Sequence, residues 1–348
     1  MKFNILDCDD SNWAYYYNEL DSKSCDIFYN QNFGKVYQQS IYQKYKIKCA
    51  AFECDSGVAI YPFVLRDLII NDEIKINDIT GYYGRNGIAT NISDINYIQK
   101  FHSLFYDYCI SNDVITSFDR FHPIINNHKL SSLNSIVRES GNFVIINLKR
   151  EIKNIENDYK HMHRKSIKKA IRGNVKIFYE QNIDNLDNFL KVYHNTLTKR
   201  NAQKFYFFSR NFYELLMKYL PENFVFFYAT VDDKIISCEL ILLSKYYAHS
   251  FFGGTLEEYR ELCSNTLLKR EIIRFLNNER YHYFLLGGGV NLNDGIYRYK
   301  NGFAPSGVFK SYIGGTIYNA NNYQKLKTNF QKNGILQDNG RIQFYDMQ

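Results

Sequence analysis

The sequence lacks the features that mark secreted, membrane-spanning and metal-binding proteins. No apolar run approaches the roughly 18 to 20 residues that a helix needs to cross a bilayer. The N-terminal residues MKFNILDCDD turn acidic where the apolar core of a signal peptide would begin. None of the 7 cysteines forms a CxxC pair, and no His, Cys and Asp residues share a metal-ligand spacing. We therefore expect a cytoplasmic, soluble protein with buried free thiols and no metal.

Several common catalytic signatures are missing as well. The chain contains no GxSxG nucleophile motif, no Walker A motif and no ordered GxGxxG. Their absence disfavours serine hydrolases, P-loop enzymes and Rossmann enzymes. The 348 residues are too many for one small domain and about right for two.

Positive charge is concentrated in the second part of the chain. Residues 1–150 carry 15 Lys/Arg and 17 Asp/Glu, a net charge of −2, whereas residues 151–348 carry 28 and 19, a net charge of +9. A basic region attracts anions. We expect an anionic partner there, such as a phosphorylated cofactor, a nucleotide-linked substrate, RNA or an acidic membrane surface, and no DNA.

The order of the expected elements repeats in the two halves. Each half places helices before an antiparallel hairpin, which a further helix and strand follow. The expected helices cover 12–20, 34–45, 96–111, 159–172, 186–200, 209–220 and 264–278, and the expected strands cover 47–54, 57–65, 114–121, 142–148, 224–231, 235–243, 246–252 and 283–286. The pattern favours an α/β (α+β) fold with one domain at 1–147, a second at 148–318 and a C-terminal tail at 319–348.

The segment 285–305, LLGGGVNLNDGIYRYKNGFAP, is the strongest candidate for a site. Three consecutive glycines, Gly287, Gly288 and Gly289, carry a cost in backbone entropy and suggest that something approaches the main chain closely. Arg298 and Lys300 are two residues apart, so on a strand both side chains would share one face. We expect a site for an anionic or carbonyl-bearing substrate.

Two carboxylates are candidates for a general base. Alternation along the strand IISCELILLS places Glu239 in an apolar setting, where a carboxylate is costly unless it is paired. Glu239 is therefore either a structural ion-pair partner or a base with a raised pKa. Asp294 is the second candidate, although Asp294-Gly295 is also a common turn pair.

Two features of the second half could bind an anion. The helix at 159–172 belongs to a stretch, KHMHRKSIKKAIRGNVK, with no acidic residue, and this is either a solvated face or a diphosphate contact that includes Arg164 and Lys168. Ser264, Asn265 and Thr266 favour a helix N-terminus, whose backbone N–H groups attract anions.

Taken together, these motifs resemble a known family. NDITGYYGRNGIAT, RFHP, RKSIKKA, YHNTLTKRNAQKFYFF, ELILL, FFGGT, NTLLKREII and LGGG…DGIYRYKNGFAP follow one another within roughly residues 40 to 320. Their order is similar to that in the FemXAB-like, peptidoglycan-bridge branch of the GNAT acyltransferase superfamily. The C-terminal motifs are the more specific part of the resemblance.

The resemblance implies two tandem GNAT-like domains with a cleft between them. Each would hold a mixed, mostly antiparallel sheet flanked by helices. Family members transfer an acyl or aminoacyl group from an acyl-CoA or an aminoacyl-tRNA to an amine. By motif, Lys300 would stabilise an oxyanion or hold a phosphate. Residues of the matching motifs would contact substrate (Tyr82, Tyr83, Arg85, His122, Arg200, Tyr206 and Arg298) or the donor (Gly253, Gly254, Ser264, Asn265 and Thr266).

Three departures from the family pattern bear on the donor and the acceptor. Thr90 stands where peptidoglycan aminoacyltransferases usually have an Asp, and the long helical-hairpin insertion of some members is missing. The usual GNAT coenzyme A loop is absent too, because residues 260–265 read RELCSN.

We arrive at one leading hypothesis and two alternatives. The leading one is a cytoplasmic N-acyltransferase that moves an acyl group from an acyl-CoA to an amine of a sugar-nucleotide or lipid-linked sugar for cell-surface polysaccharide, with peripheral membrane contact allowed. The first alternative is an aminoacyl-tRNA-dependent aminoacyltransferase. The second is a binding module without activity, built on a degenerate GNAT pair.

Overall fold

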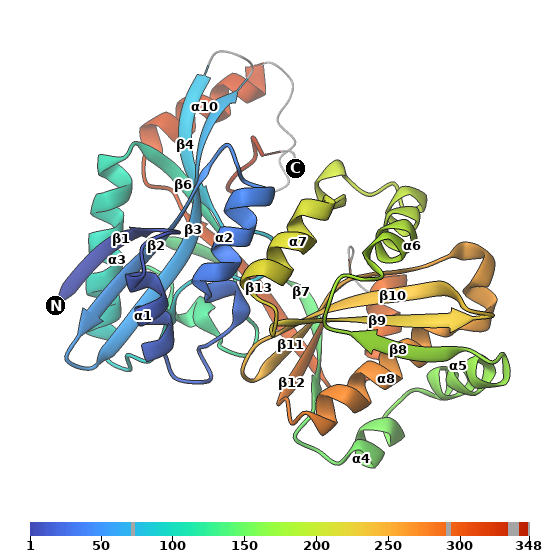
Figure 1. Cartoon of the computed structure of the whole chain (residues 1–348). Helices are drawn as coiled ribbons and strands as arrows, with labels where there is room; N and C mark the ends of the chain where they lie inside the picture. The colour runs from blue at the N-terminus through green and yellow to red at the C-terminus, as the bar shows by residue number, and fades with distance from the viewer. Residues whose placement is uncertain (71–73, 290–293, 333–340, 347–348) are drawn as a thin grey trace. The chain divides into compact units, whose positions relative to one another are not determined.

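The chain folds into two compact units (Figure 1). The computed structural model describes residues 1–70, 74–289, 294–332 and 341–346. Unit 1 consists of Met1–Ser140 and Ser311–Gln348, and unit 2 of Gly141–Lys310. The boundaries expected at 147 and 318 thus differ from those of the compact units, and the expected C-terminal tail belongs to unit 1. None of the helices in these described ranges is long and apolar enough to cross a membrane.

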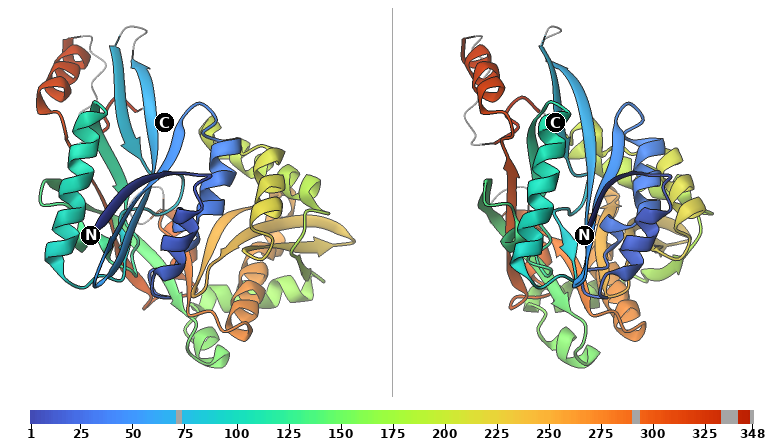
Figure 2. Two further views of the ribbon diagram at one scale, coloured as in Figure 1. Left: turned by 60° about the vertical axis from the view of Figure 1, so that its left-hand side comes forward. Right: turned by 90° about the vertical axis from the view of Figure 1, so that its left-hand side faces the viewer.

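Unit 1 is a mixed sheet with helices on both faces. Its sheet has the order β1-β2-β3-β4-β6-β13, with β5 beside β3, and every neighbour is antiparallel except the parallel pair β4 and β6. Helices α1 and α2 cover one face and α3 the other (Figure 2). The elements are β1 (Lys2–Asp7), α1 (Asn12–Glu19), η1 (Ile27–Tyr29), α2 (Gln31–Ser40), β2 (Lys46–Cys54), β3 (Gly57–Ile70), β4 (Ile74–Thr80), β5 (Ala89–Thr90), α3 (Ile95–Ser111), β6 (Val114–Arg120), η2 (Asn127–Leu130), β13 (Val308–Thr316) and α10 (Ala320–Lys332).

Unit 2 repeats this arrangement. Its sheet has the order β7-β12-β11-β10-β9-β8, and again one pair, β11 and β12, is parallel. Helices α6 and α7 lie on one face and α8 on the other (Figure 1). The elements are β7 (Ser135–Asn147), α4 (Ile152–Asn157), α5 (His161–Arg172), β8 (Lys176–Glu180), α6 (Leu186–Lys199), η3 (Lys204–Tyr206), α7 (Arg210–Tyr219), β9 (Phe224–Val231), β10 (Lys234–Leu243), β11 (Tyr247–Thr255), η4 (Glu257–Leu262), α8 (Ser264–Asn278), β12 (Tyr283–Gly287) and α9 (Gly295–Asn301).

Two strands, β7 and β13, pair in one unit although they directly follow elements of the other unit in sequence. β7 follows the unit 1 strand β6 in sequence, yet it pairs with β12 in unit 2. β13 follows the unit 2 elements β12 and α9, yet it pairs with β6 in unit 1. The chain therefore crosses between the units twice, along these two strands. Domain boundaries drawn after a strand, at 147 and near 318, miss these crossings because one strand serves both units.

Two elements of unit 2, helix α8 and the hairpin of β9 and β10, were predicted correctly from local sequence. Helix α8 begins and ends where its helical spacing predicts, at Ser264 and Asn278. The predicted hairpin of β9 and β10 turns at Asp232 and Asp233, which both have a positive φ, as a two-residue turn of matching twist requires. The core of unit 2 lies between its sheet and α8, with Ile241, Phe284 and Ile272 among its buried members.

Candidate functional site

The candidate site is in unit 2, where the two parallel strands separate. β11 and β12 pair only from Tyr247–Tyr283 to His249–Leu285. Beyond this point β11 continues beside β10, and β12 continues beside β7. The separation leaves the facing edges of both strands without a strand partner in the described pairings. An extended chain with amide groups could bind at such an edge.

Two of the three glycines, Gly287 at the end of β12 and Gly288 directly after it, are required by conformation and contacts inside unit 2. Gly287 has a φ of +91°, which favours glycine, and a Cβ at Gly288 would lie 2.7 Å from the carbonyl oxygen of Asn142. Gly289 is exposed. The close approach that the sequence suggested therefore involves the neighbouring strand β7 at Gly288. Residues 290–293 of this segment lie outside the described residues.

Lys300 lies beside these glycines. Its Nζ donates to the carbonyl oxygen of Gly288 at 2.8 Å, and a Cβ at Gly287 would lie 2.9 Å from the same Nζ. The ammonium group is thus held at the end of β12, where the parallel strands have separated. A cation there is suitably placed to stabilise negative charge on a carbonyl oxygen.

The expectation that Arg298 and Lys300 share one face of a strand is wrong, because both lie on helix α9. Residues two apart on a helix point to different sides. Arg298 is exposed, whereas Lys300 is half-buried. Asp294 starts this helix: its carboxylate accepts a hydrogen bond from the backbone N–H of Tyr297 at 2.8 Å. The Asp-Gly pair marks a capped helix start rather than a turn.

Helix α8 begins without a side-chain cap. Cys263 occupies the cap position with a φ of 56° and makes no capping hydrogen bond. Ser264, which the sequence favours as a cap, is buried, and its Oγ lies 2.6 Å from Ser237 Oγ on β10. Thr266 is buried as well, and Asn265 is half-buried. The first backbone N–H groups of a helix have no intrahelical acceptor, so this terminus can receive an anion.

Glu239 is engaged in a buried ion pair below α8. Its Oε1 accepts from Lys269 Nζ on α8, and from Ser250 Oγ on β11 at 2.5 Å. Lys269 also donates to Ser250 Oγ at 3.0 Å. Burial lowers the pKa of Lys269, and Glu239 opposes that effect. The geometry matches the ion-pair interpretation of Glu239, and it joins β10, β11 and α8.

The basic helix α5 packs against α8 and η4. Lys169 Nζ lies 3.2 Å from Glu261 Oε2, just before the α8 N-terminus. Lys165, Lys168 and Arg172 are exposed, and among the described residues none of the three has a recorded acidic partner. Arg164 instead donates to the carbonyl oxygens of residues 157 and 159, so it closes the end of α4. Both residues of α5 that were predicted to contact the donor, Arg164 and Lys168, are exposed, and Arg164 also bonds to the end of α4.

The paired glycines of β11 serve internal packing. A Cβ at Gly254 would lie 2.3 Å from Thr196 Oγ1 on α6, and one at Gly253 would lie 2.8 Å from the carbonyl oxygen of Cys238. Arg200 follows α6 as its exposed C-terminal cap residue. The backbone carbonyl of Tyr206 accepts from Tyr193 Oη at 3.1 Å. Gly254, Arg200 and Tyr206 lie on the α6 side of the unit 2 sheet, whereas the Cβ direction of Gly253 faces Glu239 on the α8 side.

The predicted substrate residues of unit 1 are largely enclosed. Tyr82 is buried, and its hydroxyl donates to the carbonyl oxygen of Phe28 at 2.5 Å. Tyr83 offers its backbone carbonyl to Tyr37 Oη at 2.9 Å. Burial, followed by the charge of Arg120, lowers the pKa of Arg85 to about 10.

His122 is also buried in unit 1. Its Nδ1 accepts from the backbone N–H groups of Ile124 and Ile125 at 3.2 and 3.1 Å, and its Nε2 lies 3.2 Å from Asp26 Oδ2. Both ring nitrogens therefore have partners within unit 1. This environment suits a structural histidine better than a substrate contact.

The sequence analysis did not select two polar residues that the structure places in buried hydrogen-bond networks. Lys269 lies in the segment LLKREII, and its side chain is buried with those of Leu268 and Ile272. Asp119, the penultimate residue of β6 in unit 1, accepts hydrogen bonds from Tyr61 Oη at 2.8 Å and Asn86 Nδ2 at 2.9 Å, and burial raises its pKa to about 7. Helical spacing could have revealed Lys269, whereas the partners of Asp119 are remote in sequence.

Known proteins share both the domain and the fold. Residues 157–301 match the family model described as an acetyltransferase (GNAT) domain. A crystal structure of FemX aligns with a TM-score of 0.71 at 10% identity and covers 94% of this chain and 100% of that one. The C-terminal domain of a putative lysylphosphatidylglycerol synthetase from Agrobacterium fabrum aligns with a TM-score of 0.57 at 13% identity, over 95% and 97%. No curated protein sequence is a significant match.

A third structure bears on the tandem arrangement. A tandem GNAT protein from the clavulanic acid biosynthesis pathway aligns with a TM-score of 0.55 at 7% identity and covers 91% of this chain and 99% of that one. The expected fold class, a pair of GNAT-like α/β domains with mostly antiparallel sheets, is confirmed. The matched domain includes α5, α8, β12 and α9, and therefore the candidate site.

Proposed function

We propose that this chain, an acyltransferase of the GNAT superfamily, moves an aminoacyl group from an RNA-linked ester to an amine. The superfamily assignment is supported by the match of residues 157–301 to the acetyltransferase domain model and by the similarity of the fold to FemX. The donor is our proposal. The likeness to FemX over nearly the whole chain favours the aminoacyl-tRNA alternative over the leading hypothesis of acyl-CoA-dependent transfer to a polysaccharide sugar. The missing coenzyme A loop at residues 260–265 points the same way.

The observation that carries the proposal is the open N-terminus of α8 beside a cationic helix. Cys263 supplies no side-chain cap. The backbone N–H groups at the start of α8 and the positive end of its dipole favour a phosphate. Helix α5, which has no acidic residue, packs against α8 and η4. The two features together attract an anionic donor to unit 2.

The length of the cationic surface favours a polyanion. Its exposed members Lys165, Lys168 and Arg172 lie along the 12 residues of α5, and Lys176 follows on β8. At 1.5 Å per residue, α5 alone is about 18 Å long. A single diphosphate reaches only part of that length, whereas an RNA strand carries phosphates along all of it.

Lys300 is the proposed catalytic residue. The acceptor amine attacks the ester carbonyl carbon, the carbonyl oxygen gains negative charge, and the carbon–oxygen ester bond then breaks. The leaving ribose oxygen takes up a proton, and the attacking nitrogen loses one. The Lys300 ammonium lies 2.8 Å from Gly288 O at the end of β12, and we propose that its positive charge stabilises an oxyanion formed there.

Neither candidate carboxylate is assigned to proton transfer. Glu239 is bound to Lys269 and Ser250. Asp294 caps α9 through the backbone N–H of Tyr297. We propose structural roles for both: Glu239 fixes α8 to the sheet, and Asp294 fixes the helix that carries Lys300. Arg85, a half-buried cation of unit 1, remains the proposed acceptor-side residue.

A transfer assay with two donors tests the proposal. The full chain is incubated with an amine acceptor and either a mixture of aminoacyl-tRNAs or acetyl-CoA. We expect transfer from the RNA-linked ester and a strong loss of it in Lys300→Ala. Transfer from acetyl-CoA alone would overturn the donor assignment. No transfer from either donor would favour a binding module.

A further inference from the structure

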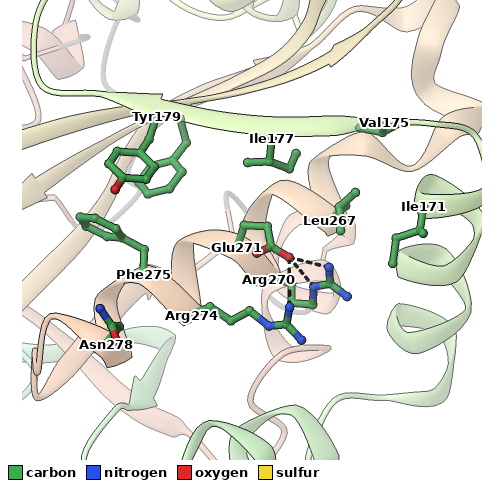
Figure 3. Close-up of a pocket in the computed structure, with 11 residues that line it drawn as sticks. Ile171, Val175, Ile177, Tyr179, Leu267, Arg270, Glu271, Arg274, Phe275 and Asn278 are labelled. Carbon is green, nitrogen blue, oxygen red and sulfur yellow. Dashed lines mark hydrogen bonds and ion pairs between the residues drawn. The ribbon is translucent and has the colours of Figure 1, made fainter.

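A pocket on the α8 side of unit 2 has no role in the transfer chemistry. It has a volume of about 510 Å³ and lies between α5, β8 and α8 (Figure 3). Its apolar lining includes Ile177 of β8, Leu267 of α8 and Ile171 of α5. The volume is in the range of small-molecule sites.

Three aromatic rings form one end of this pocket. Tyr179 lies 4.8 Å from Phe275 and 5.4 Å from Phe227 between ring centroids, and Phe227 lies 5.3 Å from Phe275. Tyr179 is 55% exposed although it stands over this apolar group. β8 pairs with β9 and has no second strand partner among the described pairings. An exposed ring at a sheet edge, above a cavity, offers a surface on which a flat ligand can stack.

The rim of the pocket carries two arginines and one glutamate of α8. Arg270 and Arg274, one helical turn apart on α8, both contact Glu271, at 2.5 and 3.5 Å (Figure 3). Arg274 also pairs with Glu156 at 2.6 Å. Ile171 connects the pocket to α5, where Lys168 and Arg172 are exposed. The two arginines of the rim are therefore balanced by Glu271 and Glu156, and the exposed Lys168 and Arg172 of the neighbouring α5 supply positive charge for an anionic ligand.

We infer that this pocket binds an unpaired base of the RNA donor, stacked on Tyr179, with the adjoining phosphates on the exposed cations of α5. Bases freed from a helix stack on aromatic rings and arginine planes, and a basic groove follows the backbone. This inference rests on the proposed function, because it assigns a second contact to the same donor.

The distance along α8 favours a single strand over coenzyme A. Asn265 stands at the open N-terminus and Phe275 lies ten residues further along the helix. At 1.5 Å per residue this is about 15 Å. A strand with a phosphate about every 3.4 Å spans it with several nucleotides. A coenzyme has a single nucleotide, which would have to contact both the N-terminus of α8 and the aromatic end of the pocket. Binding of a coenzyme or of a lipid chain is therefore treated as an alternative outcome of the test.

The test compares Tyr179 with its neighbour on the same strand. Phe178 is also exposed, at 37%, but it stacks on Tyr228 and lines a different pocket on the other face of β8. We would measure binding of the full chain to a fluorescent RNA hairpin with an unpaired tail and to the same hairpin without the tail. The variants are Tyr179→Leu, Tyr179→Phe and the control Phe178→Leu.

Stacking predicts a specific pattern of affinities. Tyr179→Leu should weaken binding of the tailed hairpin by between about fivefold and 150-fold, the range for loss of one stacked base. Its affinity for the hairpin without a tail should match that of the wild type. Tyr179→Phe, which keeps the ring, and Phe178→Leu should bind the tailed hairpin as the wild type does. Ultraviolet crosslinking of the tail should label the peptide that contains Tyr179.

Other outcomes would overturn the inference and leave the proposed function intact. If Tyr179→Leu binds the tailed hairpin as tightly as the wild type does, no base stacks there. If vesicles of anionic lipid bind through Tyr179 while the RNA tail makes no difference, the pocket takes a lipid chain. Coenzyme A binding that depends on Tyr179 would assign it to a coenzyme. Aminoacyl transfer that survives Lys300→Ala would instead count against the proposed function.

Discussion

The two units share an arrangement of strands and helices but differ where a donor would bind. In each unit, a helix connects two parallel strands that pair over a few residues and then separate. In unit 1 this helix is α3, and the carboxylate of Asp94 caps it by accepting from Asn96 N at 2.9 Å. In unit 2 it is α8, which has no side-chain cap and lies beside a basic helix. A negative cap repels the anion that an open terminus attracts.

The residues at the two points of strand separation also differ in charge, being acidic in unit 1 and basic in unit 2. The parallel pairing of β4 and β6 ends at Thr80 and Phe118, and the next residue of β6 is Asp119, a half-buried carboxyl. The pairing of β11 and β12 ends at His249 and Leu285, and β12 leads to glycines that hold the Lys300 ammonium. The same fold thus places acidic side chains in unit 1 and basic side chains in unit 2 at the corresponding positions. Anion binding is a property of the residues at the site and not of the fold.

The largest expected effect comes from the buried ion pair between Glu239 and Lys269, which fixes the connecting helix α8 of unit 2. Lys269→Met leaves the Glu239 carboxylate buried without its cation, and loss of one partner of a buried pair costs about 3 to 5 kcal/mol. We expect a drop of that size in the free energy of unfolding, measured by circular dichroism in urea. The double variant Lys269→Met/Glu239→Gln should recover part of the loss. If Lys269→Met alone unfolds as the wild type does, the pair does not anchor α8.

The next effect concerns the cation at the strand separation of unit 2. Lys300→Ala should lower kcat by about 100- to 1,000-fold, as loss of one oxyanion donor does, and leave the thermal midpoint of unfolding nearly unchanged. Lys300→Arg keeps the charge and should retain part of the activity. Equal kcat values for Lys300→Ala and the wild type would show that the cation at the strand separation of unit 2 has no catalytic role.

A smaller effect follows from giving α8 the negative start that α3 has. Asn265→Glu places a carboxylate in the first turn of α8, which stabilises the helix by a few tenths of a kcal/mol to about 1 kcal/mol but repels phosphate. We expect about tenfold weaker RNA binding without loss of thermal stability. The matched change in unit 1, Asp94→Asn, keeps a capping oxygen and should leave RNA binding as it is. A variant Asn265→Glu that binds RNA normally would show that the donor does not use this terminus.

A separate effect, confined to folding stability, is the pH dependence contributed by unit 1. Because burial raises the pKa of Asp119 to about 7, the folded chain holds a proton there that the unfolded chain releases near pH 4. Folding stability from this group is therefore full below about pH 4 and declines as the pH rises to about 7. Asp119→Asn should flatten the stability profile over this interval, measured by thermal unfolding. An unchanged slope would mean that Asp119 ionises normally.

Local patterns predicted those elements whose signals lie close together in sequence. The bounds of α8 and the β9–β10 hairpin follow from helical spacing and from a two-residue turn. The strand exchange of β7 and β13 could not be predicted, because strand pairing between distant segments leaves no local signal. Helix α9 was missed since Asp294-Gly295 indicates a turn and a cap equally well, and only the hydrogen bond to Tyr297 N distinguishes them.

The candidate site was predicted in part for the same reason. Lys300 and the region around Ser264 were recognised from motifs, and the structure places them near the strand separation of unit 2 and at the start of α8. The partner of Glu239 was not predicted, because Lys269 is thirty residues away and only the fold brings the two together. The absence of a cap at Cys263 also depends on its backbone conformation, which composition does not reveal.

The most direct test of the difference between the units is the salt dependence of RNA binding. The association constant of the full chain for tRNA is measured over a range of salt concentrations, for the wild type and for Lys165→Gln/Lys168→Gln on α5. We predict a steep linear fall of log K with log salt, and a slope shallower by about 1.5 for the variant, which has lost two phosphate contacts. Binding that is flat in salt, or a slope that is identical in the two proteins, would contradict the account.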